Sequence, residues 1–152
     1  MAAGKWKLYD YAKLNIGNGL IDLDTHAFKI ILLSSASNAN TLSVGTGLLA
    51  DLTNQLSTAN GYTQNSKVLT GTWTRSSGTI TFDGDNPVWT ASGGPIAARF
   101  AVIYDDTAAG DPLLCVCLLD TTPADVTATD GNTLTITMNA SGIFTLSGAD
   151  SD

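Results

Sequence analysis

The sequence predicts an all-β domain, and three observations about its composition and pattern support this. All 14 acidic residues are Asp and none is Glu, so one of the better helix-forming residues is missing. The chain contains 21 Thr and 15 Gly; Thr suits the surface of a sheet, while Asp and Gly suit turns. Short apolar or alternating segments recur along the 152 residues, which is the length of one domain. We therefore expect a single domain over 1–152, a β-sandwich or barrel-like fold of about eight short antiparallel strands with one short helix.

The amino-terminal segment alternates between apolar and polar side chains. In an extended chain Trp6 and Leu8 fall on one face, and Lys5, Lys7 and Tyr9 fall on the other. This pattern predicts a short strand, or an extended arm that takes in the first 13 residues.

A buried strand and a helix come next. The run 28–33 is mostly apolar and is bounded by polar residues, which predicts a buried strand. Residues 34–47 are rich in Ser, Asn and Gly and indicate a loop. Four leucines then recur at helical spacing, which predicts the short helix near 48–56.

The second half of the chain consists of further short strands. Segments 68–75 and 79–82 alternate and are separated by a Ser-Ser-Gly turn, so we expect a hairpin. The remaining strands are expected at 88–89, 98–104, 113–119, 133–138 and 143–146. A long polar loop is expected over 120–132, and residues 147–152 are expected to form a flexible acidic tail.

Charge is divided unevenly along the chain. Residues 1–99 carry seven bases and six acids, whereas residues 100–152 carry eight acids and no base. The asymmetry fits either simple solubility or a head-to-tail contact, in which a basic amino-terminal segment lies on an acidic neighbour. A net charge of -7 argues against nucleic-acid binding, and no apolar run is long enough to predict a membrane span.

Residue types that carry catalysis are sparse. The single histidine, His26, precedes the strand at 28–33, and no nucleophile-bearing turn accompanies it. Cys115 and Cys117 fall on one face of a predicted strand, where a disulfide between them would be strained, so we expect two reduced core residues. A zinc site needs about four ligands, which this set does not supply. We therefore expect no enzyme activity, no metal and no cofactor.

Two pairs of aspartates could supply oxygen ligands to calcium. They are Asp22 with Asp24, and Asp83 with Asp85. Neither matches the calcium-loop pattern, which requires more acidic ligands and a closing Glu. Turns in which the side chain accepts a backbone N–H explain both pairs more simply.

Several segments resemble a family of small β-rich virion structural proteins of tailed bacteriophages and prophages. The similarity covers nearly the whole chain and is carried by residues 7–15, 17–24, 28–33, 60–63, 67–69, 82–85, 88–90, 98–105 and 136–146. These motifs are structural, so the resemblance implies no active-site residues in this chain. Cys115 and Cys117 depart from the ordinary strand residues expected at their positions.

The resemblance implies an accessory protein of the virion. The function that the resemblance favours is that of a capsid decoration (cement) protein, made in the host bacterial cytoplasm, that binds the outside of the head shell and stabilises it. The implied partners are the major capsid protein and further copies of the chain, as a homotrimer. The segment Lys5, Trp6, Lys7, Leu8 and Tyr9 is the candidate partner-binding site, with Trp6 and Tyr9 as anchors or, alternatively, as core residues.

Two other functions stay open. A head- or tail-fibre-associated adhesin would bind a host surface glycan through an exposed loop such as 34–47 or 120–132. A depolymerase would need a carboxylate pair in a cleft, for which Asp83 and Asp85 are the candidates.

Overall fold

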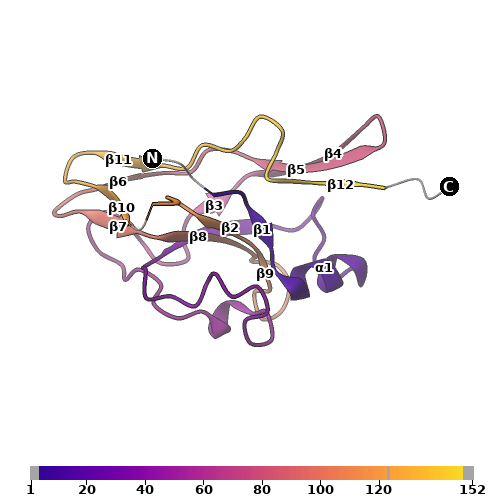
Figure 1. Cartoon of the computed structure of the whole chain (residues 1–152), viewed down its shortest axis with the longest axis horizontal. Helices are drawn as coiled ribbons and strands as arrows, with labels where there is room; N and C mark the ends of the chain where they lie inside the picture. The colour runs from indigo at the N-terminus through magenta and orange to yellow at the C-terminus, as the bar shows by residue number, and fades with distance from the viewer. Residues whose placement is uncertain (1–3, 123, 149–152) are drawn as a thin grey trace.

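The computed structural model describes residues 4–122 and 124–148, and it shows a layered, mostly β fold (Figure 1). Its strands are β1 (Lys7–Leu8), β2 (Phe28–Leu33), β3 (Val68–Leu69), β4 (Gly71–Ser76), β5 (Thr79–Gly84), β6 (Val88–Thr90), β7 (Ile96–Ala98), β8 (Phe100–Asp105), β9 (Leu113–Leu118), β10 (Val126–Ala128), β11 (Thr133–Thr135) and β12 (Phe144–Ser147). The described chain also contains one α-helix, α1 (Asp10–Gly17), and one 3₁₀ turn, η1 (Leu49–Asp51). No helix in this part of the chain is long and apolar enough to cross a membrane.

The central layer is a five-stranded antiparallel sheet in the order β1-β9-β8-β2-β3. Strands β2, β8 and β9 are buried along almost their whole length, on both faces of the sheet. Their sequences are uniformly apolar because a strand covered on both faces has no side that faces solvent, so it needs no polar residues at alternate positions. Ile30 pairs with Ile103, and Val102 pairs with Val116, at the middle of the sheet.

The upper layer in Figure 1 consists of the sheet β12-β5-β4 and the pair β11-β6. The hairpin β4–β5 turns through Ser77 and Gly78, both with positive φ, which is the turn geometry that suits the strand twist. Phe82 of β5 packs against Phe28 of the central sheet with ring centroids 5.2 Å apart, and against Phe144 at 5.4 Å. The contact with Phe28 joins the two layers, and the contact with Phe144 lies within the upper sheet.

The other face of the central sheet is covered by irregular chain and by α1 (Figure 1). The segment 34–67 is fastened to the sheet by a bridge between Leu33 and Gln55 and by the Leu56 N–H, which donates to the Leu32 carbonyl. A second bridge joins Leu48 to Pro112. The three layers together confirm an all-β fold with one short helix. The strands number twelve rather than about eight, and none of the described sheets closes into a barrel.

The expected helix near 48–56 was wrong in position. Only the 3₁₀ turn η1 forms there, because the Asp51 carboxylate accepts hydrogen bonds from the N–H groups of Thr46 and Leu48 and closes a compact loop. The periodic leucines contact the sheet from irregular backbone. The α-helix is α1 instead, which begins within the stretch expected to form an arm; it buries only Ala12, so apolar periodicity gave no signal.

The two ends of the chain also differ from expectation. Described residues of the proposed arm lie against β9: the Gly4 N–H donates to the Leu118 carbonyl at 2.8 Å, and β1 follows. Ser147 ends β12 rather than beginning a tail. Residues 1–3 of the expected arm and 149–152 of the expected tail lie outside the described residues. The expected polar loop 120–132 contains β10, which pairs with β7.

Candidate partner-binding surface

The five residues of the candidate binding segment divide into exposed and packed side chains. Lys5 and Lys7 are exposed, whereas Trp6 and Leu8 are half-buried and pack against the core. Tyr9 is fully buried, and its hydroxyl donates to the Ala39 carbonyl at 2.7 Å. Burial raises the pKa of the Tyr9 hydroxyl above its usual range. Tyr9 is therefore a core residue and not a surface anchor, because its ring is buried and its hydroxyl is hydrogen-bonded to Ala39.

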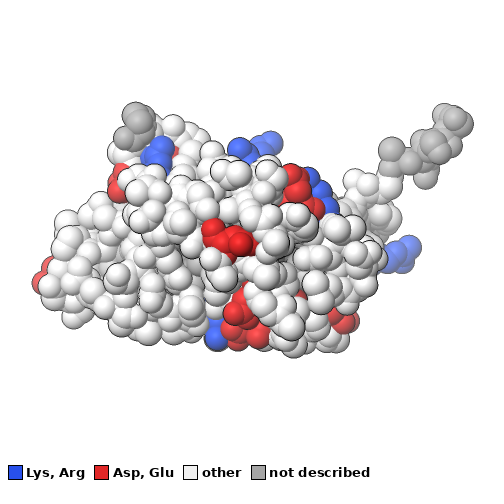
Figure 2. All heavy atoms as spheres, turned by 90° about the horizontal axis from the view of Figure 1, so that it is seen from below, with Lys and Arg blue, Asp and Glu red and all other residues white. Residues whose placement is uncertain are grey.

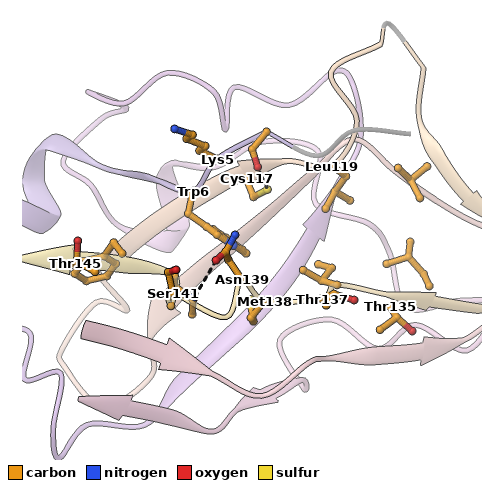
Figure 3. Close-up of a pocket in the computed structure, with 17 residues that line it drawn as sticks. Lys5, Trp6, Cys117, Leu119, Thr135, Thr137, Met138, Asn139, Ser141 and Thr145 are labelled. Carbon is orange, nitrogen blue, oxygen red and sulfur yellow. Dashed lines mark hydrogen bonds between the residues drawn. The ribbon is translucent and has the colours of Figure 1, made fainter. Parts of the chain in front are cut away.

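Beside this segment lies a solvent-open cavity of about 980 Å³, which we call the side groove (Figure 3). It runs between the amino-terminal segment and the chain that leads from β11 to β12. Its apolar lining includes Trp6, Leu119, Val126, Ile136, Met138 and Phe144. Figure 3 shows the Trp6 side chain directed into the groove.

The side groove has few groups that could do chemistry. Among the described residues of its lining, Lys5 and Cys117 are the titratable ones. The remaining polar side chains come from Thr, Asn and Ser; Asn139, for example, uses its Oδ1 to accept the Ser141 N–H at 2.8 Å (Figure 3). An active site usually gathers several titratable groups with altered pKa values, and this lining does not.

The residues of the amino-terminal segment that line the groove, Gly4 to Trp6, lead directly into β1, whose outer edge is open. β1 is an outer strand of the central sheet, and β9 is its single neighbour among the described strands. The Tyr9 N–H donates to the Leu114 carbonyl at 3.1 Å, so the alternation of the backbone turns the N–H and C=O of Leu8 away from β9. Such unpaired groups form a template for a further strand.

A second open edge borders the groove on the side of the upper layer. The Ile136 N–H donates to the Pro87 carbonyl at 3.1 Å, and the Met138 N–H donates to Asn86 Oδ1 at 2.7 Å. The same alternation turns the N–H groups of Thr135 and Thr137 away from β6, and both residues line the groove. The sequence signal for this wall was the alternation over 133–138, which was interpreted only as a strand.

Lys5 and Lys7 carry charges that no described carboxylate neutralises. Among the described residues, ion pairs join Lys13 to Asp10, Lys29 to Asp106 and His26 to Asp105. The face built from irregular chain and α1 is mostly uncharged, with carboxylates scattered over it and bases toward its margins (Figure 2). The amino-terminal segment is thus a basic edge on a molecule with a net charge of -7.

The two cysteines are free thiols in the core, as the sequence predicted. Burial raises the pKa of Cys117 to about 11 and that of Cys115 well above its usual value. Cys117 lies beneath the amino-terminal segment and its Sγ is 3.3 Å from the Gly4 carbonyl. A thiol held protonated in this way is a poor nucleophile.

The histidine has a partner that the sequence did not reveal. His26 Nδ1 lies 2.6 Å from Oδ2 of Asp105, which is fully buried at the end of β8. Oδ1 of Asp105 accepts the N–H groups of Thr107 and Ala108. The pair joins the loop before β2 to the turn that follows β8.

Three of the four aspartates considered as calcium ligands, Asp22, Asp83 and Asp85, accept backbone N–H groups. Asp22 accepts the N–H groups of Asp24 and Thr25 and the Thr25 hydroxyl, which lower its pKa. Asp85 accepts the Thr70 N–H at 2.7 Å. Within residues 4–122 and 124–148, no group of three or more His, Cys or Asp side chains is placed to hold a metal ion.

The loops considered for glycan binding differ in their attachment. Residues 34–47 are held against the sheet, with Ala39 and Val44 buried. The region around 120–132 is tied down by Arg99, whose guanidinium donates to the carbonyls of Thr122 and Ala124.

Comparisons with known proteins add no relative to this description. No protein-family model, no curated protein and no solved structure matches the chain.

Proposed function

We propose that this chain is a non-enzymatic structural protein of a bacteriophage virion, a decoration protein that binds the outside of the head shell and stabilises it. The observation that supports this most is the side groove, which has an apolar lining and few titratable groups and lies next to the open edge of β1. Extended protein segments bind such edges by adding a strand. The groove is therefore suited to a protein partner, and the major capsid protein is the one we propose.

The rest of the molecule is suited to this function. A decoration protein has to stay soluble before assembly and rigid after it. The buried central sheet supplies a firm core, and the excess of carboxylates favours solubility. The resemblance to small virion proteins of tailed phages points the same way, and a homotrimer on the capsid surface is the assembly that we propose.

Gold-labelled antibody on purified virions tests this function. The virions are those of the phage or prophage that encodes the chain, viewed by electron microscopy. Label spread over the head is the expected result, and pre-immune antibody on the same particles is the control. Label confined to the tail or to one vertex would favour the fibre or adhesin function, and particles without label would contradict a virion protein.

A further inference from the structure

We propose that the side groove receives an extended, acidic segment of the capsid partner, which adds a strand to the open edge of β1. This inference rests on the proposed function and identifies the site and the chemistry of its ligand. It also changes the role of the amino-terminal segment, which acts as one wall of a receptor site rather than as an arm that reaches out to a neighbour.

The backbone of β1 provides the pairing groups for the incoming strand. Leu8 turns its N–H and C=O away from β9, as the Tyr9-to-Leu114 hydrogen bond requires. Main-chain hydrogen bonds of this kind give affinity without demanding a particular sequence. The pairing is confined to a short edge, because α1 begins at Asp10 and ends the strand.

The lining of the groove adds selectivity through side chains. A strand points alternate residues to one face, so every second residue of the segment would meet Trp6, Met138 and the other apolar residues of the groove. Trp6 is half-buried, so part of its ring is already fixed by the core and part stays available for contact. Tryptophan held in this way is typical of residues that dominate binding energy.

Charge decides which segment fits. Lys5 and Lys7 flank Trp6, are exposed, and lack a carboxylate partner among the described residues. Carboxylates on the incoming segment would supply the missing partners. The same lysines oppose pairing of β1 with β1 of a second copy, because like charges would then lie side by side. The basic edge therefore selects an acidic partner strand and disfavours a symmetric dimer through β1.

Charge reversal at the two lysines tests the proposal without disturbing the core. Phage heads that lack this protein are mixed with the purified chain, and bound protein is measured by co-sedimentation. Lys5→Glu with Lys7→Glu is expected to weaken binding at least 10-fold, whereas Lys5→Arg with Lys7→Arg should bind like the original chain. Lys13→Glu with Arg75→Glu makes the same change in net charge elsewhere and should also bind normally.

The outcomes separate the proposal from the function on which it rests. If the original chain does not bind heads, both fail. If it binds and the charge-reversed variant binds equally well, the decoration function stands and the groove proposal is overturned. Sedimentation velocity of the free protein tests whether a second copy of the chain occupies the groove instead. If the protein self-associates and the charge reversal at Lys5 and Lys7 abolishes this association, the groove belongs to a second copy and the proposal is contradicted.

Discussion

The central sheet and the upper layer are built from similar numbers of strand residues but differ in what covers them. β2, β8 and β9 are buried on both faces, whereas β4 is exposed along nearly its whole length. The chain between β11 and β12 leaves the regular sheet, and the side groove opens beside it. The difference teaches that burial is concentrated in the inner strands of the central sheet, whereas the upper layer, like the outer strand β1, leaves strand edges and apolar residues uncovered.

The largest effect should come from shortening a side chain in the central sheet, which is buried on both faces. Leu32 is fully buried in β2, so Leu32→Ala should lower the free energy of unfolding by about 2–5 kcal/mol. Leu146 on β12 is 40% exposed, and Leu146→Ala should cost well under half as much. Urea unfolding of both variants provides the measurement, and equal losses would contradict the division between the layers.

A smaller effect is expected where irregular chain is fitted against β6. Gly61 has a φ of 84°, and a Cβ at this position would lie 2.1 Å from the Thr90 carbonyl oxygen. Gly61→Ala should therefore cost about 2–4 kcal/mol, from left-handed strain and forced displacement together. Gly78 in the hairpin has a similar φ of 81° but open space around it, so Gly78→Ala should cost only about 1–2 kcal/mol. Thermal unfolding would disprove this account if Gly78→Ala were the more harmful change.

The pair of His26 and Asp105 should have an intermediate effect. His26→Ala leaves the buried Asp105 carboxylate with the two backbone donors from its own turn, which should cost about 1–3 kcal/mol. The comparison is Lys29→Met, which breaks the more exposed pair with Asp106 and should cost about 0–1 kcal/mol. Chemical denaturation of the two variants checks the order, and a larger loss for Lys29→Met would mean that the His26 pair contributes little.

The smallest perturbation concerns the thiols and leaves the fold intact. Because burial raises the pKa of Cys117 to about 11 from an ordinary value of 9.0, its thiolate fraction at pH 8 should fall about 100-fold. A thiol-reactive chromogenic disulfide should accordingly react at least that much more slowly with native than with urea-unfolded protein. The raised pKa also means that this residue stabilises the fold below about pH 9 and that the contribution is lost as the pH rises toward 11. Fast reaction of the native thiols at pH 8 would show that the amino-terminal segment opens readily.

The sequence predicted the inner strands of the central sheet well, because a strand buried on both faces consists of consecutive apolar residues. The apolar runs at 28–33, 98–104 and 113–119 became β2, β8 with part of β7, and β9. The hairpin was confirmed for the same kind of reason, since Ser77 and Gly78 adopt the positive φ values that such a turn requires. In these segments local preference and tertiary environment agree.

The remaining features depend on contacts that a linear pattern does not contain. The leucines after 47 have helical spacing, but the backbone N–H groups of Thr46 and Leu48 donate to the Asp51 carboxylate and hold the chain in a turn. The burial of Tyr9 depends on Ala39, which is 30 residues away, and the His26 pair spans 79 residues. The groove depends on two segments from opposite ends of the chain, so its individual residues could be recognised as apolar but not as neighbours.

Hydrogen–deuterium exchange, comparing the free protein with the protein bound to phage heads, tests the central claim most directly. The account predicts slower exchange on binding at residues 4–8 and 134–146, including the Leu8 amide, while the central strands β2 and β8 stay protected in both states. Protection confined to the irregular segment 34–67, or no new protection in bound protein, would contradict the claim that the side groove is the partner-binding site.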